Sequence, residues 1–249
     1  MLVLALRTLK INAANTVART LGSGRRFMLT IDIVTLFPDF FKSPLKESLL
    51  EKAMTKGLIK VRAHDLRDWT HDRHKTADDK PFGGGAGMVM KPEPIFECVE
   101  AIGKDAWVVL LDPQGEPMSQ TLAAKLAKEK QLVLIAGHYE GVDQRVKDHL
   151  IDQEISVGDF ITMGGEAPAL CLIEAVVRLV PGVLGNAESV KHESFQTGIL
   201  EHPHYTRPRE YRGWKVPEVL VSGDHKELEA WRKKTAERVT RQKRPDLLK

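Results

Sequence analysis

Two charged residues in the second half of the chain could carry out acid–base chemistry together. Arg178 lies in the mostly apolar stretch 166–180, where an unpaired guanidinium would be costly. Glu193 lies in "KHESFQTG", a polar stretch without periodicity. A carboxylate can remove a proton from an amide-like group while an arginine offsets the negative charge that develops. A structural ion pair and a solvated loop acid explain the same residues, so alone they leave the chemistry open.

A second candidate lies in the stretch 64–79, "HDLRDWTHDRHKTADD", which is rich in His and Asp. His71 and His74 are three residues apart, a spacing that can place two ligands on one helix face. No cysteine or HExxH pattern accompanies them, so we expect no tight metal site. Side-chain networks or RNA contacts are the favoured uses, and His138 is expected to be a surface or packing residue.

Four glycines occupy five positions in "FGGGAGM", residues 82–88, shortly after Asp78 and Asp79. The chain has no G-x-x-x-x-G-K-[ST] motif, and the cluster is not a dinucleotide fingerprint because prolines follow it instead of a helix. Glycine in such density serves turns or close approach to a ligand. We therefore expect a mobile flap that covers a pocket.

Apolar runs separated by helical patterns predict a parallel sheet with helices on its faces. In particular, Ser119 caps a helix between two short apolar runs, which is a βαβ unit. We also expect a helix that starts at Pro44 behind the N-cap Ser43, and another capped by Ser222. The expected strands are 29–37, 58–66, 107–112, 131–137 and 154–161, and the helix 166–180 is expected to be buried on most faces.

Three of these strands are followed by turns rich in small residues. The turns span 110–117, 136–146 and 156–168. Each alone would be an ordinary strand–helix turn. Because ligands bind at the carboxyl ends of parallel strands, the three together predict a ligand pocket.

Charge is unevenly distributed over the 249 residues, whose net charge is +3. Residues 207–249 hold 13 Lys and Arg against 7 Asp and Glu, which suggests that this segment faces a polyanion, although a solvated helix explains it equally well. Residues 1–27 are basic and acid-free, and we interpret them as an extension or a mis-assigned start before Met28.

Cys98 and Cys171 are interpreted as reduced core residues of a cytoplasmic protein. No apolar run reaches the roughly 18 residues that a membrane span needs, so we expect no membrane association.

Several long motifs resemble one family, the bacterial tRNA (guanine-N1)-methyltransferases. They are "THDRHKTADDKPFGGGAGMVM", "LDPQGEP", "AGHYEGVDQRV", "SVGDFITMGGEAPA", "RLVPGVLGN" and "HPHYTRP". The resemblance implies an α/β fold of the SPOUT type, with a parallel sheet, a C-terminal trefoil knot and a small, mainly helical C-terminal domain. The implied division is a methyltransferase domain at 28–184, a flexible linker at 185–198 and a basic tRNA-binding domain at 199–249.

The resemblance also implies a homodimer that methylates N1 of guanosine 37 in tRNA. Glu193 would be the base, Arg178 would stabilise charge and Asp78 would lie near the reaction. The donor would be S-adenosylmethionine, and Mg²⁺ is a reported requirement for which the sequence offers no distinct ligand set. The implied cofactor contacts are Leu110, Leu111, Gly137, Tyr139, Glu140, Val157, Gly158, Asp159, Phe160, Ile161, Thr162, Gly164, Gly165 and Pro168.

Three residues depart from the family pattern. Glu193 replaces the usual aspartate, Phe82 replaces a tyrosine, and Asp112 stands where serine is common. Other readings therefore stay open: a methyltransferase for another RNA, an RNA-binding protein with weakened catalysis, or a sugar- or nucleotide-phosphate enzyme.

Overall fold

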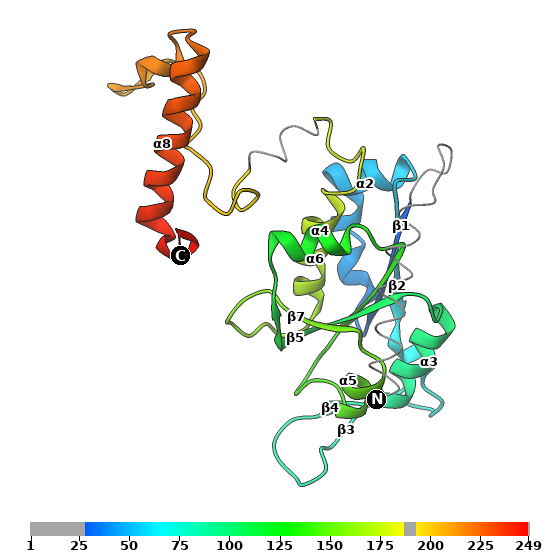
Figure 1. The fold of residues 1–249 in the computed structure, drawn as a ribbon. Helices are drawn as coiled ribbons and strands as arrows, with labels where there is room; N and C mark the ends of the chain where they lie inside the picture. Colours follow the sequence, from blue (N-terminus) through cyan, green and yellow to red (C-terminus); the bar gives the residue numbers. More distant parts are fainter. Residues whose placement is uncertain (1–27, 187–192, 249) are drawn as a thin grey trace. The chain divides into compact units, whose positions relative to one another are not determined.

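The computed structural model describes residues 28–186 and 193–248 (Figure 1). The expected extension at 1–27 lies outside the described residues. So do residues 187–192 of the expected linker at 185–198. Contacts divide the chain into two compact units, one up to Gly185 and one from Asn186 onward. Each unit is described by itself.

The first unit is built on a parallel sheet of five strands in the order β2–β1–β6–β5–β7. All four neighbouring pairs are parallel, as the βαβ pattern predicts. The strands are β1 (Leu29–Thr35), β2 (Ile59–Asp65), β5 (Trp107–Pro117), β6 (Gln131–Ala136) and β7 (Gln153–Ser156). Because the strands are parallel, the ends of β5, β6 and β7 meet at one edge of the sheet.

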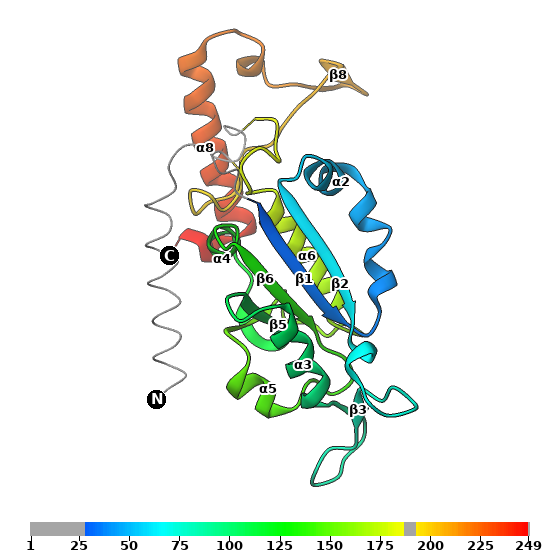
Figure 2. The same cartoon turned by 90° about the vertical axis from the view of Figure 1, so that its right-hand side faces the viewer.

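Helices cover both faces of this sheet (Figure 2). One core cluster joins the sheet to α2 (Ser48–Thr55), α4 (Gln120–Leu126) and α6 (Glu166–Val177). The other joins it to α3 (Pro92–Ile102) and α5 (Gln144–His149). Apolar side chains alternate between the two clusters along β1: Ile31 and Ile33 face the first, and Val34 faces the second. Burial on both faces explains why the strands are continuous apolar runs.

Several expected boundaries were wrong. Ser43 precedes a short 3₁₀ turn, Pro44–Lys46, and makes no side-chain cap; α2 begins only at Ser48. Strand β7 ends at Ser156 because Gly158, at φ +155°, turns the chain away.

Helix α6 is buried on most faces, as expected: within Glu166–Val177 only Ala167, Cys171 and Glu174 are exposed. Cys171 lies on this exposed strip, whereas Cys98 is buried on α3. Burial raises the pKa of the Cys98 thiol to about 12. The expectation of two core cysteines is therefore right for Cys98 and wrong for Cys171.

The most buried charged group of the sheet is Asp32 on β1, whose side chain is fully buried. Its carboxylate accepts hydrogen bonds from Arg62 at 2.6 and 2.8 Å, from Gln131 at 2.8 Å, and contacts His64 Nε2 at 2.7 Å. Burial raises the pKa of Asp32, but the hydrogen bonds from His64, Arg62 and Gln131 outweigh it and lower the pKa to about 2.

This pKa predicts a pH-dependent contribution to stability. An aspartate whose folded pKa is below its unfolded value of 3.8 stabilises the fold above pH 3.8, and that contribution is lost as the pH falls toward 2. We expect Asp32→Asn to lower the free energy of unfolding by about 2 kcal/mol at pH 6, with the difference shrinking below pH 4. Urea titrations at several pH values measure it. The exposed Asp39 is the control, and an equal loss in Asp39→Asn would contradict the assignment.

The second unit contains α8 (His225–Lys243), the hairpin β8 (Glu210–Tyr211) and β9 (Trp214–Lys215), and two 3₁₀ turns, η4 (Glu218–Leu220) and η5 (Pro245–Leu248). Asp224, not Ser222, caps α8: its carboxylate accepts from the backbone amides of Lys226 and Glu227. Among the described residues, no helix combines the length and apolar character needed to cross a bilayer.

Candidate active site

A cleft of about 550 Å³ opens at the edge of the sheet where β5, β6 and β7 end. Its walls are the irregular part of β5, the turns that follow β6 and β7, and residues of α5 and α6. The pocket expected from the strand-end pattern is therefore present in the first unit.

Most residues that the family resemblance assigns to the cofactor line this cleft. The exception is Asp159, which is exposed and lies outside the lining. The lining residues from that set are Leu110, Leu111, Gly137, Tyr139, Glu140, Val157, Gly158, Phe160, Ile161, Thr162, Gly164, Gly165 and Pro168.

Glycines allow the turns to approach one another closely. The Gly165 amide donates to the Gly137 carbonyl at 2.7 Å, and a Cβ on Gly165 would lie 2.6 Å from the Cα of Ala136. At Gly115 a Cβ would collide with the backbone of Ile155 on β7. Side chains are excluded at both positions, because the backbones of neighbouring turns pack directly on one another.

His138 was expected to be a surface or packing residue, and instead it lines the cleft. Its Nε2 lies 2.6 Å from Oε2 of Glu166, which is 4% exposed. The other oxygen of Glu166 accepts from the Thr35 hydroxyl at 2.6 Å. This network joins the end of β1, the turn after β6 and the start of α6. No signal in the sequence marks this network, because Thr35 and Glu166 are 131 residues apart in the chain.

Asp112, the unusual residue in "LDPQGEP", has a partner that explains it. The Lys147 ammonium on α5 lies 2.9 Å from Asp112 and 3.0 Å from Glu154, and donates to Gln114 at 3.2 Å. Burial lowers the pKa of Lys147, but the hydrogen bonds to Asp112 and Glu154 outweigh burial and raise it. Lys147 thus holds the irregular part of β5 against β7.

Removing this cation should cost stability. Lys147→Met leaves Asp112 and Glu154 facing each other without compensation, so we expect the free energy of unfolding to fall by about 3 kcal/mol. Denaturant titration measures the loss. The double variant Asp112→Asn/Lys147→Met should recover part of the lost free energy of unfolding. If it recovers none, Asp112 is not the carboxylate that Lys147 compensates.

The glycine cluster forms the tip of a hairpin whose strands are β3 (Asp78–Asp79) and β4 (Val89–Met90). Gly83, Gly84 and Gly85 have φ values of +84°, +80° and +125°, which side chains rarely adopt. The hairpin joins the cleft wall at its base, where the Glu140 amide donates to the Met88 carbonyl at 3.0 Å. Phe82 is fully exposed at the tip. That the hairpin moves as a cover stays a prediction.

The three expected catalytic residues are not among those that line the cleft. Asp78 lies on β3 at the base of the hairpin. Arg178 is the C-cap of α6, and α6 begins at the cleft, so twelve helical residues place Arg178 about 18 Å along the axis. Glu193 lies in the second unit and is partly buried.

Comparison with known proteins identifies the family. The model of the family described as tRNA (guanine-1)-methyltransferase TrmD matches residues 29–249. This chain belongs to that family. It is 54% identical over 222 residues to the tRNA (guanine-N(1)-)-methyltransferase of Dictyoglomus turgidum, covering 89% of this chain and 90% of the relative.

Two further relatives carry the same name. The protein of Carboxydothermus hydrogenoformans is 53% identical over 222 residues, with 89% of this chain and 88% of the relative covered. The protein of Brevibacillus brevis is 52% identical over 222 residues, with 88% and 91% covered. The resemblance drawn from the motifs is confirmed.

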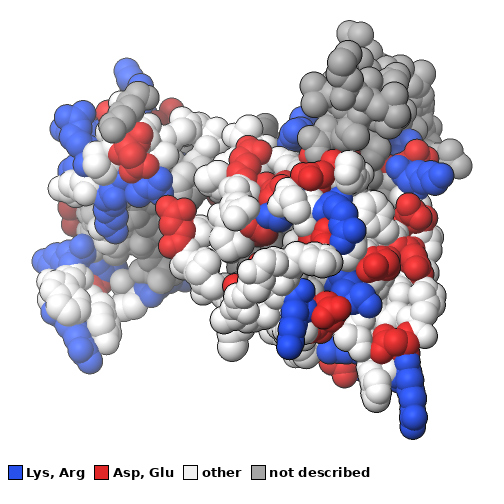
Figure 3. All heavy atoms as spheres, turned by 90° about the horizontal axis from the view of Figure 1, so that it is seen from below, with Lys and Arg blue, Asp and Glu red and all other residues white. Residues whose placement is uncertain are grey.

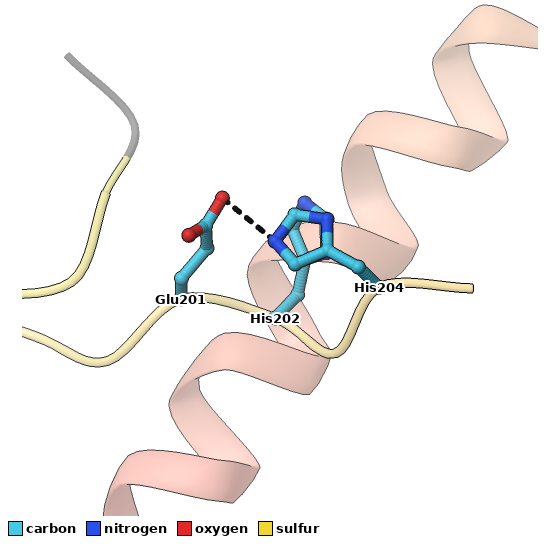
Figure 4. A group of neighbouring side chains, drawn as sticks. All are labelled: Glu201, His202 and His204. Carbon is cyan, nitrogen blue, oxygen red and sulfur yellow. Dashed lines mark ion pairs between the residues drawn. The ribbon is translucent and has the colours of Figure 1, made fainter. Parts of the chain in front are cut away.

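Mg²⁺, which the family resemblance implies, would need a set of oxygen ligands in this protein. Among the described residues, one group of three metal-ligating side chains lies within reach of a common ion: Glu201, His202 and His204 (Figure 4). Glu201 and His204 already contact each other at 3.0 Å, and imidazoles are not the ligands that Mg²⁺ prefers. The donor set does not fit Mg²⁺.

Proposed function

We propose that this protein transfers a methyl group from S-adenosylmethionine to N1 of guanosine 37 in tRNA, in the cytoplasm. Membership of the family and the names of the relatives support the reaction and the substrate. The observation that carries the proposal is the cleft itself, because it gathers the family's cofactor motifs from three separate strand ends into one cavity. We further propose that the turns around this cleft are the loops of a trefoil knot.

The cleft fits the donor chemically. Apolar side chains of Leu110, Leu111 and Phe160 offer surfaces for an adenine ring, and glycine-lined turns leave backbone groups accessible to hydrogen-bond it. When bound, S-adenosylmethionine supplies an electrophilic methyl group. The protein's task is then to hold the guanine in line and to remove its N1 proton.

Glu193 is proposed to remove that proton, and Arg178 to offset the charge that develops on O6. The target base must leave its stack to reach them, at a cost of about a few kcal/mol. Basic side chains predominate on the face of the second unit that Figure 3 shows, which suits contacts with the tRNA backbone.

We also propose that the protein acts as a homodimer, and the position of Arg178 supports this. A rigid α6 holds Arg178 about 18 Å from the cleft that the same helix begins, so a second copy is proposed to supply this arginine. Phe160, Ile161 and Met163 are 58%, 81% and 99% exposed at the rim of the cleft. Exposed apolar side chains of this size mark an interaction surface.

Methyl transfer from labelled S-adenosylmethionine to unmodified tRNA, followed by mapping of the modified nucleotide, tests the proposal. We expect the label on N1 of guanosine 37, and its loss when guanosine 36 is replaced. Label on another RNA or another nucleotide would show that guanosine 37 of tRNA is not the substrate. Cofactor binding without transfer, or phosphate-ligand binding without cofactor affinity, would overturn the function.

A further inference from the structure

We propose that Thr240, a buried residue of α8, positions the segment that carries Glu193. The inference rests on the proposed role of Glu193 as the base. It concerns the second unit alone, in which residues 193–201, here called the base segment, lie against the C-terminal half of α8.

The base segment forms a hydrogen-bonded turn. The Gln196 amide donates to the Glu193 carbonyl at 3.2 Å, and the Phe195 amide donates to the Ile199 carbonyl at 2.9 Å. The Glu201 amide donates to the Ser194 hydroxyl at 3.0 Å, which closes the turn beside Glu193. These bonds fix the backbone conformation of the segment around Glu193.

Thr240 joins this turn to the helix. Its side chain is 0% exposed, and its hydroxyl donates to the Ala236 carbonyl at 2.8 Å. The hydroxyl hydrogen is thereby directed into the helix, and the oxygen accepts the Leu200 amide at 2.9 Å. Leaving the partly buried Leu200 amide without this acceptor would cost stability, so the base segment is held where the Thr240 oxygen lies.

A second contact involves Phe195 of the base segment. The Arg244 guanidinium, at the end of α8, lies 5.9 Å from the centre of the Phe195 ring. Asp246 fixes Arg244 with hydrogen bonds of 2.6–3.2 Å. Phe195 has φ +74°, a strained value for a residue other than glycine, and such a conformation persists only where its surroundings enforce it. Thr240 of α8 and Arg244, the residue at the C-cap of α8, therefore both contact the base segment.

The expected consequence concerns turnover and not cofactor affinity. The cleft belongs to the first unit, whereas Thr240 acts on the position of the base. A misplacement of about 1 Å in a reacting group can cost around a hundredfold in rate. Thr240 is thus a positioning residue.

The test compares three variants of the full-length protein. Thr240→Val keeps the shape but removes both hydrogen bonds, Thr240→Ser keeps the hydroxyl, and Thr235→Val changes another buried threonine of the same helix. We expect Thr240→Val to lower kcat about 10- to 100-fold at saturating tRNA and to leave the cofactor Kd within twofold. Thr240→Ser and Thr235→Val should stay within threefold of the parent. Hydrogen exchange at the Leu200 amide should quicken in Thr240→Val alone.

Two results would overturn the inference. One is faster exchange at Leu200 with an unchanged kcat, and the other is an equal loss of kcat in Thr235→Val. Glu193→Gln is measured in parallel, because it tests the role of Glu193 as the base separately from the positioning role of Thr240. If Glu193→Gln stays active, the proposed base is wrong. If it is inactive while Thr240→Val is normal, only the positioning role fails.

Discussion

Glu193→Gln is expected to abolish methyl transfer, with a loss of at least about a thousandfold in kcat, and to leave the Kd of S-adenosylmethionine unchanged. The amide has nearly the shape of the carboxylate but cannot accept the N1 proton. Single-turnover transfer to tRNA and calorimetric titration of the cofactor measure the two quantities. A low rate with a weakened Kd would instead indicate a disturbed fold.

Two further substitutions serve as controls for Glu193→Gln. Glu193→Asp restores the residue that the family usually carries, so we expect it to keep activity or to exceed the parent. Glu201→Gln removes a carboxylate eight residues away that pairs with His204, and it should leave transfer within about threefold. Undiminished methylation by Glu193→Gln would reject Glu193 as the base, whatever the controls show.

Arg178→Ala is expected to be nearly inactive alone and to regain activity in mixed dimers. The partner variant is Gly137→Leu, which is designed to obstruct the cleft that Gly137 lines; a Cβ at this position meets its neighbours only at 3.8–4.0 Å. One of the two sites in a mixed dimer combines an open cleft from one copy with an intact arginine from the other. Random mixing makes about half of the dimers mixed, and each mixed dimer has one complete site out of two. Activity should therefore return to about a quarter of that of the parent.

The outcome of this mixing experiment separates two arrangements. If Arg178 serves its own cleft, a mixed dimer has no complete site and activity stays at background. Co-refolding of the two variants, with size-exclusion chromatography to establish the oligomeric state, provides the measurement. Each variant refolded by itself is the control, and background activity in the mixture would contradict the shared site.

The framework could be predicted because it depends on local patterns. Continuous apolar runs at 29–37 and 131–137 require burial on two faces, and a capped helix beginning after Ser119 between two strands requires a parallel pairing. The glycine-rich turns could be assigned to a pocket, since parallel strands present their carboxyl ends at one edge. Boundaries were less certain, because Ser43 and Ser222 resemble caps in sequence but make none to α2 and α8.

The long-range polar contacts could not be predicted. Asp32, Lys147 and Thr240 look ordinary in sequence, and each acquires its role from partners distant along the chain: His64, Asp112 and Leu200. No periodicity marks such pairs. They exist because the folded backbone brings together donors and acceptors that are wholly or partly shielded from water, and leaving either without a partner is costly.

The amino-acid sequence by itself determined the family, the parallel α/β architecture and the residues available for chemistry, since these follow from motifs and from the spacing of apolar residues. Only the tertiary structure decided that Arg178 and Glu193 do not line the cavity that the cofactor motifs form: Arg178 stands at the far end of α6, and Glu193 belongs to a separate unit. The physical reason is that a helix is a rigid spacer of fixed rise, so residues at its two ends cannot meet at one site within one copy.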